Sequence, residues 1–324
     1  EWQKLGGIAD KMRADIENAW KKDLEFRCLN TPSATGNYLG LRGVLDNTGY
    51  TAGSTVTFTL DVATNATFRR YKLFQGIQDN MELDVYNGTN KVATITGVRS
   101  IDVAASTFVG DLSADIAATA STFYLYNQGS FNQDLNGLGG IIDDGTYTTS
   151  LGGLTTSPPW ESYSLGNSGT LRDFAPAQMD ELSLRGIKAN GGKAVHSWMS
   201  FGMKQQLMAY AQRVVAINTT AGSKSPFKVN PSGDIEQWGP NATMKTSAFM
   251  PAHEIFLIQK DGIIIEEQQP LMPVTVGVNG SSENFWQRLP GKDTWEAVLV
   301  HDVQQRTRRR NVHFRYVDLN QPSF

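Results

Sequence analysis

The sequence predicts an α+β fold with a small all-β insertion. Three observations lead to this prediction. Apolar residues recur every four positions over residues 8–28, hydrophobic and polar residues alternate within about 46–128, and helical and strand patterns alternate from 173 onward. With 324 residues, of which 40% are hydrophobic and 19% charged, the chain is long enough to bury a substantial core without disulfides.

The first predicted element is a long helix. Its apolar row consists of Ile8, Met12, Ile16, Trp20, Leu24 and Cys28. Because a turn takes 3.6 residues, a row with a spacing of four winds around the helix, which suits a long helix that crosses a sheet or one that lies between two partners. Pro32 disfavours further α conformation, so the helix is expected to end near Asn30. As part of the row, the sole cysteine, Cys28, is interpreted as a small buried hydrophobe.

The segment 46–128 has the pattern of a small antiparallel barrel or sandwich. Alternation is clearest at Val56, Phe58, Leu60 and Val62, and further strands are expected at 81–86, 92–98, 107–109 and 122–126. Asn87-Gly88 predicts a tight hairpin turn, because both positions need positive φ. We expect this insertion to fold by itself.

The remaining chain is expected to combine helices and strands. The predicted elements are a rigid aromatic loop at 149–163, a helix from Pro176 with Met179, Leu182 and Ile187 on its buried face, a strand at 194–199, a helix at 201–214 capped by Ser200, a polar loop at 221–231, a hairpin of 253–258 and 263–267 around Asp261-Gly262, and strands at 295–300 and 312–317.

Patterns that carry catalysis or metal binding are missing from the sequence. The glycine-rich segment Gly137–Gly145 matches neither of the two glycine patterns that bind phosphate, G-x-G-x-x-G and G-x-x-x-x-G-K-[ST]. The serine-nucleophile motif G-x-S-x-G does not occur, and no two of the four histidines have the close helical spacing of a zinc site. Asp143 and Asp144 are adjacent, and in a turn before Gly145 they are expected to bond their own backbone. We therefore predict no enzyme, no cofactor and no metal.

The expected interface residues are basic and aromatic. Arg306, Arg308, Arg309 and Arg310 form a dense basic run, either an electropositive patch for phosphate or acidic neighbours, or a solvated turn between two strands. Trp160 and Trp286 lie in predicted loops and are candidate interface anchors. A net charge of −3 argues against a surface that binds nucleic acid throughout, and no apolar run is long enough for a membrane span.

Taken in order, several segments resemble the major capsid proteins of tailed bacteriophages, which have the Hong Kong 97-like fold. The first helix resembles their spine helix, and "GLGGIIDDG" at Gly137–Gly145 resembles a small-residue loop of that fold. "LRDFAPAQMDELSLRGIKANGG" followed by "KAVHSWMS" resembles the axial domain. "FMPAHEIFLIQKDGIIIEE" and "TWEAVLVHDVQQRTRRRNVHFRYVDL" resemble strands of the peripheral domain. The resemblance covers most of 1–45 and 129–324.

The resemblance implies a division of the chain into five parts. These are the spine helix and the start of the peripheral domain (1–45), an inserted β-barrel or sandwich (46–128), peripheral-domain loops (129–172), the axial domain (173–240), and peripheral-domain strands with the C-terminus (241–324). Family members have an N-terminal arm and an extended loop before the spine helix, whereas only residues 1–7 precede it here. We expect either a missing upstream stretch or a different way of clasping neighbours.

The implied function is structural. The chain would self-assemble as pentamers and hexamers into an icosahedral phage head, located in the virion capsid after assembly in the host cytoplasm, with no membrane involved. Scaffolding, portal and cement or decoration proteins are expected partners, and double-stranded DNA would be contacted non-specifically. The β insertion would lie on the outer surface or over a capsomer contact. An encapsulin-like compartment shell and a β-rich binding or adhesion protein are the alternatives.

Overall fold

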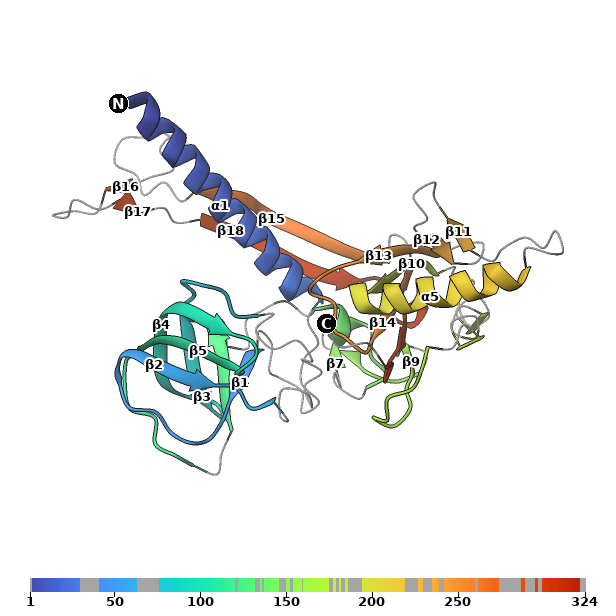
Figure 1. Ribbon diagram of the computed structural model, residues 1–324, viewed down its shortest axis with the longest axis horizontal. Coiled ribbons are helices and arrows are strands. Elements are labelled where there is room, and N and C mark those ends of the chain that lie inside the picture. The colour runs from blue at the N-terminus through green and yellow to red at the C-terminus, as the bar shows by residue number, and fades with distance from the viewer. Residues whose placement is uncertain are drawn as a thin grey trace.

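The computed structural model has a mixed α+β fold that is mostly sheet, which confirms the predicted fold class (Figure 1). The structure describes all residues except 1, 30–40, 63–75, 120–121, 132–134, 136, 146–149, 152–153, 159, 175–176, 179–180, 182–183, 186–193, 219–226, 230–234, 239–241, 260–261, 274–286, 289–294, 297–298 and 321–324. Within the described residues, no helix is long and apolar enough to cross a membrane.

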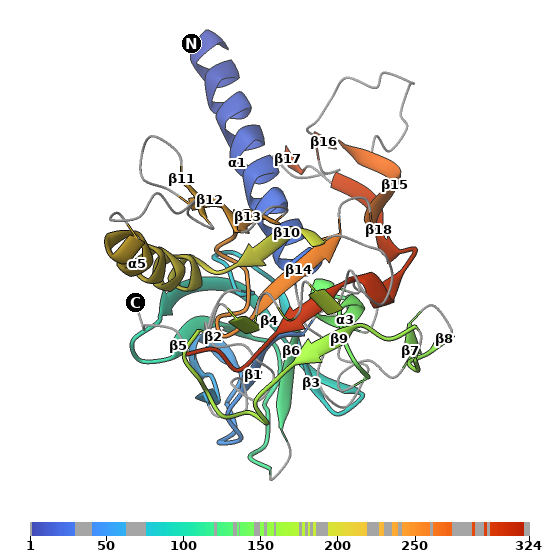
Figure 2. The same ribbon diagram turned by 90° about the vertical axis from the view of Figure 1, so that its right-hand side faces the viewer.

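The longest helix, α1, spans Trp2–Leu29. It begins six residues before Ile8, because helical hydrogen bonding extends beyond the apolar row that was used to predict the helix. Its N-terminal end projects from the rest of the molecule (Figures 1 and 2). At its other end Phe26 and Leu29 are buried. Cys28 is only half-buried, less than the buried position that we predicted for it.

A two-stranded antiparallel ribbon lies beside α1 (Figure 2). It consists of β15 (Ile263–Pro273) and β18 (Leu299–Thr307), with Ile263 opposite Thr307 and Pro273 opposite Leu299. The ring of Trp20 on α1 meets the ring of His301 on β18 edge-on, with 4.4 Å between centroids. The first helix and one of the last strands are therefore packed together.

The β-rich segment forms one six-stranded antiparallel sheet in the order β1-β6-β3-β4-β5-β2. Its strands are β1 (Leu41–Leu45), β2 (Gly53–Thr59), β3 (Leu83–Asn87), β4 (Asn90–Asp102), β5 (Thr107–Leu112) and β6 (Phe123–Asn127). It has a hydrophobic core of its own, which includes Phe58, Leu83 and Phe108. We call residues 41–131 the β unit.

The β unit contains the hairpin predicted from Asn87-Gly88, but its turn lies one residue further along the chain. Asn87 is the last residue of β3 and pairs with Asn90, and of the two expected turn residues only Gly88 has a positive φ, +61°. The unit also contains β1, which begins before residue 46, where we placed the start of the insertion. All five residues of β1 are buried, so it lacks the polar alternation that marks a half-exposed strand.

The second sheet has seven strands in the order β11-β12-β13-β10-β14-β19-β9. Its strands are β9 (Tyr163–Leu165), β10 (Ala194–Met199), β11 (Phe227–Val229), β12 (Ile235–Trp238), β13 (Ala242–Thr246), β14 (Ile255–Gln259) and β19 (Phe314–Tyr316). Helix α5 (Phe201–Asn218) lies beside this sheet (Figure 1). Met203 and Leu207 of α5 pack against Leu257 and Tyr316 in a core of the sheet.

Local signals at the start of α5 were correct. The strand predicted at 194–199 is β10, and Ser200 caps the helix, since its Oγ accepts a hydrogen bond of 3.3 Å from the Met203 amide. The predicted polar loop at 221–231 differs, because it contains β11, which pairs with β12. Of the helix expected from Pro176, the residues Met179, Leu182 and Ile187 lie outside the described residues.

The predicted hairpin around Asp261-Gly262 is wrong. β14 and β15 occupy the two expected positions but belong to different sheets. β14 pairs with β10 and β19, whereas β15 pairs with β18, so strands distant in sequence determine the pairing. The apolar runs of both segments suggested strands covered on both faces. Four of the five β14 residues are buried, but Ile265 of β15 is 53% exposed.

Short elements complete the fold. They are helix α3 (Leu138–Ile141), the pair β7 (Ser150–Leu151) and β8 (Leu154–Thr155), the pair β16 (Gln287–Arg288) and β17 (Trp295–Glu296), and the 3-10 helix η1 (Arg310–Val312). Leu138 and Ile141 of α3 share a buried cluster with Leu29 at the end of α1. This cluster joins the long helix to the seven-stranded sheet through Phe256 and Ile258 of β14.

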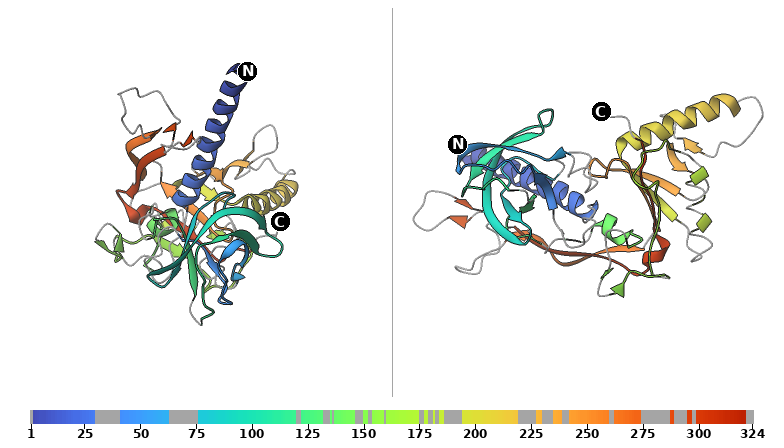
Figure 3. Two further views of the ribbon diagram at one scale, coloured as in Figure 1. Left: turned by 90° about the vertical axis from the view of Figure 1, so that its left-hand side faces the viewer. Right: turned by 90° about the horizontal axis from the view of Figure 1, so that it is seen from below.

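The β unit contacts the end of α1 through a buried arginine. Arg42 of β1 is 2% exposed, and its Nη1 lies 2.5 Å from Oδ1 of Asp23 on α1. The guanidinium also lies over the ring of Phe26, 4.8 Å from its centroid. Gly76 fits tightly here, because a Cβ would lie 2.8 Å from the Phe26 ring. Figure 3 shows the β unit and α1 at the same end of the molecule.

Candidate functional site

The predicted basic run separates into exposed and buried parts. Arg306, the last arginine of β18, is exposed and forms an ion pair with Glu266 on the facing strand. Arg308 and Arg309 follow the strand and are exposed. Arg306, Arg308 and Arg309 form the accessible part of the run, and their interface role stays a prediction.

Arg310 does not belong to the surface patch that we predicted. Its side chain is fully buried within its own chain, where it begins η1. Its Nε donates to the carbonyl of Ile141 (2.8 Å), Nη2 to the carbonyl of Gly140 (3.3 Å) and Nη1 to Oγ1 of Thr156 (2.6 Å). Burial lowers the pKa of the Arg310 guanidinium, and the nearby carboxylate of Asp143 acts in the opposite direction.

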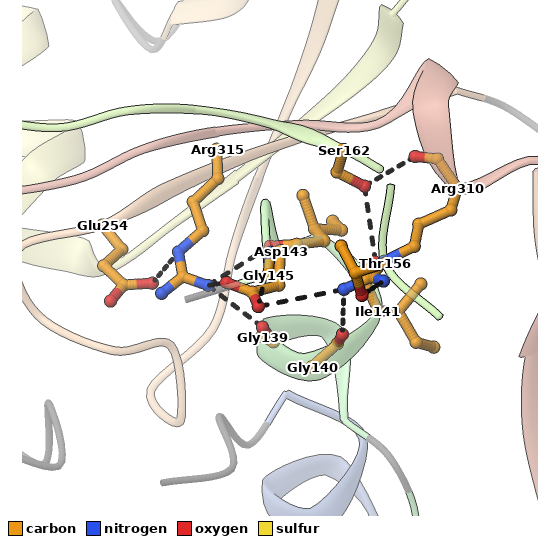
Figure 4. Close-up of polar contacts among 11 residues, drawn as sticks. Gly139, Gly140, Ile141, Asp143, Gly145, Thr156, Ser162, Glu254, Arg310 and Arg315 are labelled. Atoms are coloured by element: carbon orange, nitrogen blue, oxygen red, sulfur yellow. Dashed lines mark hydrogen bonds and ion pairs between the residues drawn. The ribbon is translucent and has the colours of Figure 1, made fainter. Parts of the chain in front are cut away.

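A second buried arginine, Arg315 on β19, reaches the same short helix. Its Nη1 donates to the carbonyls of Gly139 (3.0 Å) and Ile142 (3.2 Å). Its Nε lies 3.1 Å from Oε2 of Glu254, and its Nη1 lies 3.6 Å from Oδ1 of Asp143. Figure 4 shows the two arginines on either side of Asp143, above the carbonyls of α3.

We call Arg310, Arg315, Asp143 and Glu254 the buried arginine cluster. It contains two guanidinium groups and two carboxylates, all of them at most 1% exposed, so the formal charges balance. The C-terminal carbonyls of a helix have no partners within the helix, and here the arginines supply donors to them. The cluster therefore joins the glycine-rich segment to the C-terminal strand of the sheet, and its polar groups face protein rather than solvent.

The glycine-rich segment has a structural explanation in this cluster. Gly139 and Gly140 are buried in α3, and their carbonyls accept hydrogen bonds from the two arginines. As predicted, Asp143 also bonds its own turn, because its Oδ2 accepts a hydrogen bond of 3.2 Å from the Gly145 amide. Asp144, the next residue, is exposed, so the two adjacent carboxylates do not share a site.

The two candidate tryptophans have different outcomes. Trp160 lies in a turn in which its amide donates to the carbonyl of Ser157 (2.7 Å), and its ring is half-buried. Its Nε1 is buried with no hydrogen-bond acceptor in the described part of the chain. Trp286 lies outside the described residues. The role of both residues as interface anchors stays a prediction.

The histidines lie in separate environments. His196 lies on β10, and Nδ1 of His253 is hydrogen-bonded to the carbonyl of Leu319. His301 pairs with Glu267, 2.5 Å from Nε2 to Oε1. His313 is fully buried, and burial lowers its pKa from 6.5 to about 4. Among the described residues, no three histidine, cysteine or acidic side chains are grouped so that they could hold a metal.

Sequence reasoning missed the roles of Arg315 and Glu254. Each is a charged residue within an otherwise apolar segment, "HFRYV" and "HEIFLI", and a charge in such a position is expected to be paired. The two segments are neighbouring strands in the structure, with Arg315 opposite Phe256. Two opposite charges in apolar strands are therefore the signal that could have indicated the cluster.

Comparisons with known proteins give little information about the family of this chain. No protein-family model matches the chain, and no curated protein matches it. Among solved structures, the chain is similar to the capsid asymmetric unit of cyanophage A-1(L), with 15% sequence identity and a TM-score of 0.39. The match covers 59% of this chain and 61% of that chain, so it spans about three fifths of the capsid chain. This similarity is too low to assign a fold family.

Proposed function

We propose that the chain is a shell-forming major capsid subunit with the Hong Kong 97-like fold, from a tailed bacteriophage. One observation supports this most: the long helix α1 lies beside the ribbon of β15 and β18, at one end of a compact unit of sheet and helix. This arrangement suits the spine helix and the peripheral and axial domains that the sequence resemblance implies. The proposed role is structural and needs no catalysis.

The parts of the chain take the following places in this proposal. α1 is the spine helix, and the β15–β18 ribbon belongs to the peripheral domain. The sheet with α5 is the axial domain. This differs from the division expected from the sequence, which placed β13, β14 and β19 in the peripheral domain, because β13 and β14 pair with β10, and β19 pairs with β14. The β unit is an insertion between the spine helix and the rest, on the outer surface of the shell or over a capsomer contact. Pentamers and hexamers would enclose double-stranded DNA, with scaffolding, portal and cement or decoration proteins as further partners.

Self-association is the property that tests the proposal. The native mass of the purified full chain would be measured by light scattering, and the same fractions would be imaged in negative stain. We expect capsomer rings or hollow shells. A stable monomer at all concentrations would contradict the proposal and favour a β-rich binding protein. Shells that carry a protein cargo and no DNA in the native host would favour an encapsulin-like compartment.

Arg308 and Arg309 are the proposed contact residues, because they are exposed and adjacent at the end of the ribbon. Replacing both by glutamate reverses the local charge without disturbing Arg310, which is buried. We expect fewer assembled particles from the double glutamate variant and normal assembly from the matched double lysine variant, which keeps the charge. Normal shells from the glutamate variant would rule out an interface role for this pair.

A further inference from the structure

The inference concerns the attachment of the β unit to α1. The β unit folds around its own cores, because its two buried clusters consist only of residues from within the unit. The end of α1 belongs to a different core, in which Leu29 packs with residues of α3 and β14. Separation of the β unit from α1 would therefore leave these cores intact.

β1, the strand that contacts α1, is held within the β unit along both of its edges. One edge pairs with β6. At the other edge, the Asp46 amide donates to the carbonyl of Thr59 (2.9 Å), and the Asp61 amide donates to the carbonyl of Val44 (3.0 Å). The two end strands of the sheet, β1 and β2, thus meet and close it into a barrel. Arg42 on β1 therefore stays with the barrel whether or not the barrel is docked on α1.

The burial of Arg42 in the docked position is incompletely compensated. Its side chain is fully buried, and Nη1 is paired with Asp23 on α1. Nε and Nη2 are buried with no hydrogen-bond acceptor among the residues that the structure describes. A buried N–H group without an acceptor costs free energy, which contact with water would restore. Docking of the barrel therefore depends strongly on the carboxylate that balances the charge of Arg42.

Asp23, the other partner, is in a different environment. Its side chain is 18% exposed, and its Oδ2 lies 4.0 Å from Nη1 of Arg27, one turn further along α1. Without Arg42, the Asp23 carboxylate would keep water and a second arginine. Without Asp23, the Arg42 guanidinium would lose its counter-charge while buried. Removing one partner of an ion pair is most costly when the charge left behind stays buried.

We propose that Arg42 and Asp23 form a latch, which holds the β unit on α1 only while the charged Asp23 carboxylate is paired with Arg42. When Asp23 is neutralised, or drawn away by a competing cation, Arg42 leaves its buried site and regains water. The barrel then separates from α1 as a folded body (Figure 3 shows the docked position). This inference does not rest on the proposed shell-forming function, because the latch lies within one chain.

The test measures the distance between α1 and the β unit in the full chain by double electron–electron resonance. Nitroxide labels are attached through Asn18→Cys on α1 and Thr89→Cys in the β unit, both at exposed positions, in a chain that also carries Cys28→Ala. The protein concentration is kept below that of assembly. We expect one narrow distance distribution when the latch is intact. Asp23→Asn is expected to raise the ratio of released to docked molecules about tenfold or more and to broaden the distribution.

Arg42→Met is the counterpart that separates a latch from an ordinary stabilising ion pair. Methionine keeps apolar contact with Phe26 and removes the buried charge together with its N–H groups. We expect the β unit to stay docked in Arg42→Met, both alone and combined with Asp23→Asn. Asp111→Asn is the matched control, since it breaks the Arg99–Asp111 pair (2.7 Å) within the β unit and is expected to leave the distance unchanged.

The possible outcomes are distinct. If Asp23→Asn stays docked like Asp111→Asn, the inference is wrong. Equal release in Arg42→Met and Asp23→Asn would also overturn it, because attraction within the pair would then hold the unit. So would an unsubstituted latch that is already open. Circular dichroism verifies the fold of each variant, and Asp23→Ser replaces Asp23→Asn if that variant does not fold. The proposed function is tested separately by assembly, so it can stand or fail independently of the latch.

Discussion

The buried arginine cluster leads to a prediction about stability. Replacing Arg310 by methionine keeps much of the side-chain volume but removes three hydrogen bonds and the ion pair with Asp143, which lies 3.8 Å away. The carbonyls of Gly140 and Ile141 would then lose a charged donor in a buried site. Removing one partner of a buried pair typically costs about 3–5 kcal/mol. We expect Arg310→Met to lower the free energy of unfolding by that amount.

The assay is urea unfolding at a protein concentration below that of assembly, followed by circular dichroism and tryptophan fluorescence. Arg309→Met is the matched control, because Arg309 is the preceding residue and is exposed. We expect it to change stability by at most about 0.5 kcal/mol. If Arg310→Met were as stable as Arg309→Met, the conclusion that Arg310 joins η1 to α3 would be wrong.

Three further predictions follow from other buried contacts. The pKa of His313 is lowered to about 4 in the folded chain, so between pH 6.5 and 4 only the unfolded chain binds a proton at this residue. The free energy of unfolding should therefore fall by roughly 3 kcal/mol as the pH falls from 6.5 to 4. His313→Asn should reduce this dependence of the free energy of unfolding on pH, measured by urea unfolding at a series of pH values. Gly262→Ala should lower the melting temperature, because its Cβ would lie 2.5 Å from the His313 ring, whereas Gly53→Ala, with only a 3.8 Å contact, should change it little. Residues 41–131 alone should give a dispersed NMR spectrum, since this unit has its own core; a disordered spectrum would contradict this.

Local signals predicted the elements whose geometry depends on neighbouring residues. The cap at Ser200 and the turn at Asn87-Gly88 are such cases, because the atoms involved lie within three residues of one another. Asp261-Gly262 gave a similar local signal but a wrong pairing, since β14 and β15 find their partners elsewhere in the chain. Strand pairing depends on long-range packing that a turn motif does not contain.

The candidate site was harder to predict for the same reason. Arg310 appeared to be one of four similar arginines, yet it is buried because its acceptors at Gly140 and Ile141 lie about 170 residues earlier in the chain. β1 was missed because it is buried throughout and contains Arg42, whose charge is compensated by Asp23 across the contact with α1. Burial of a charge depends on partners, and a sequence pattern does not locate them.

The packing of the first helix against one of the last strands has a consequence during protein synthesis. Trp20 contacts His301, and Arg310 bonds α3, so these contacts cannot form until residues 301 and 310, respectively, have left the ribosome. At about 5–20 residues per second, this takes roughly 15–60 s. The β unit is contiguous in sequence and can fold long before that time. Translation itself therefore delays completion of the fold, because unfinished chains lack both β18, the second strand of the ribbon, and β19 of the seven-stranded sheet.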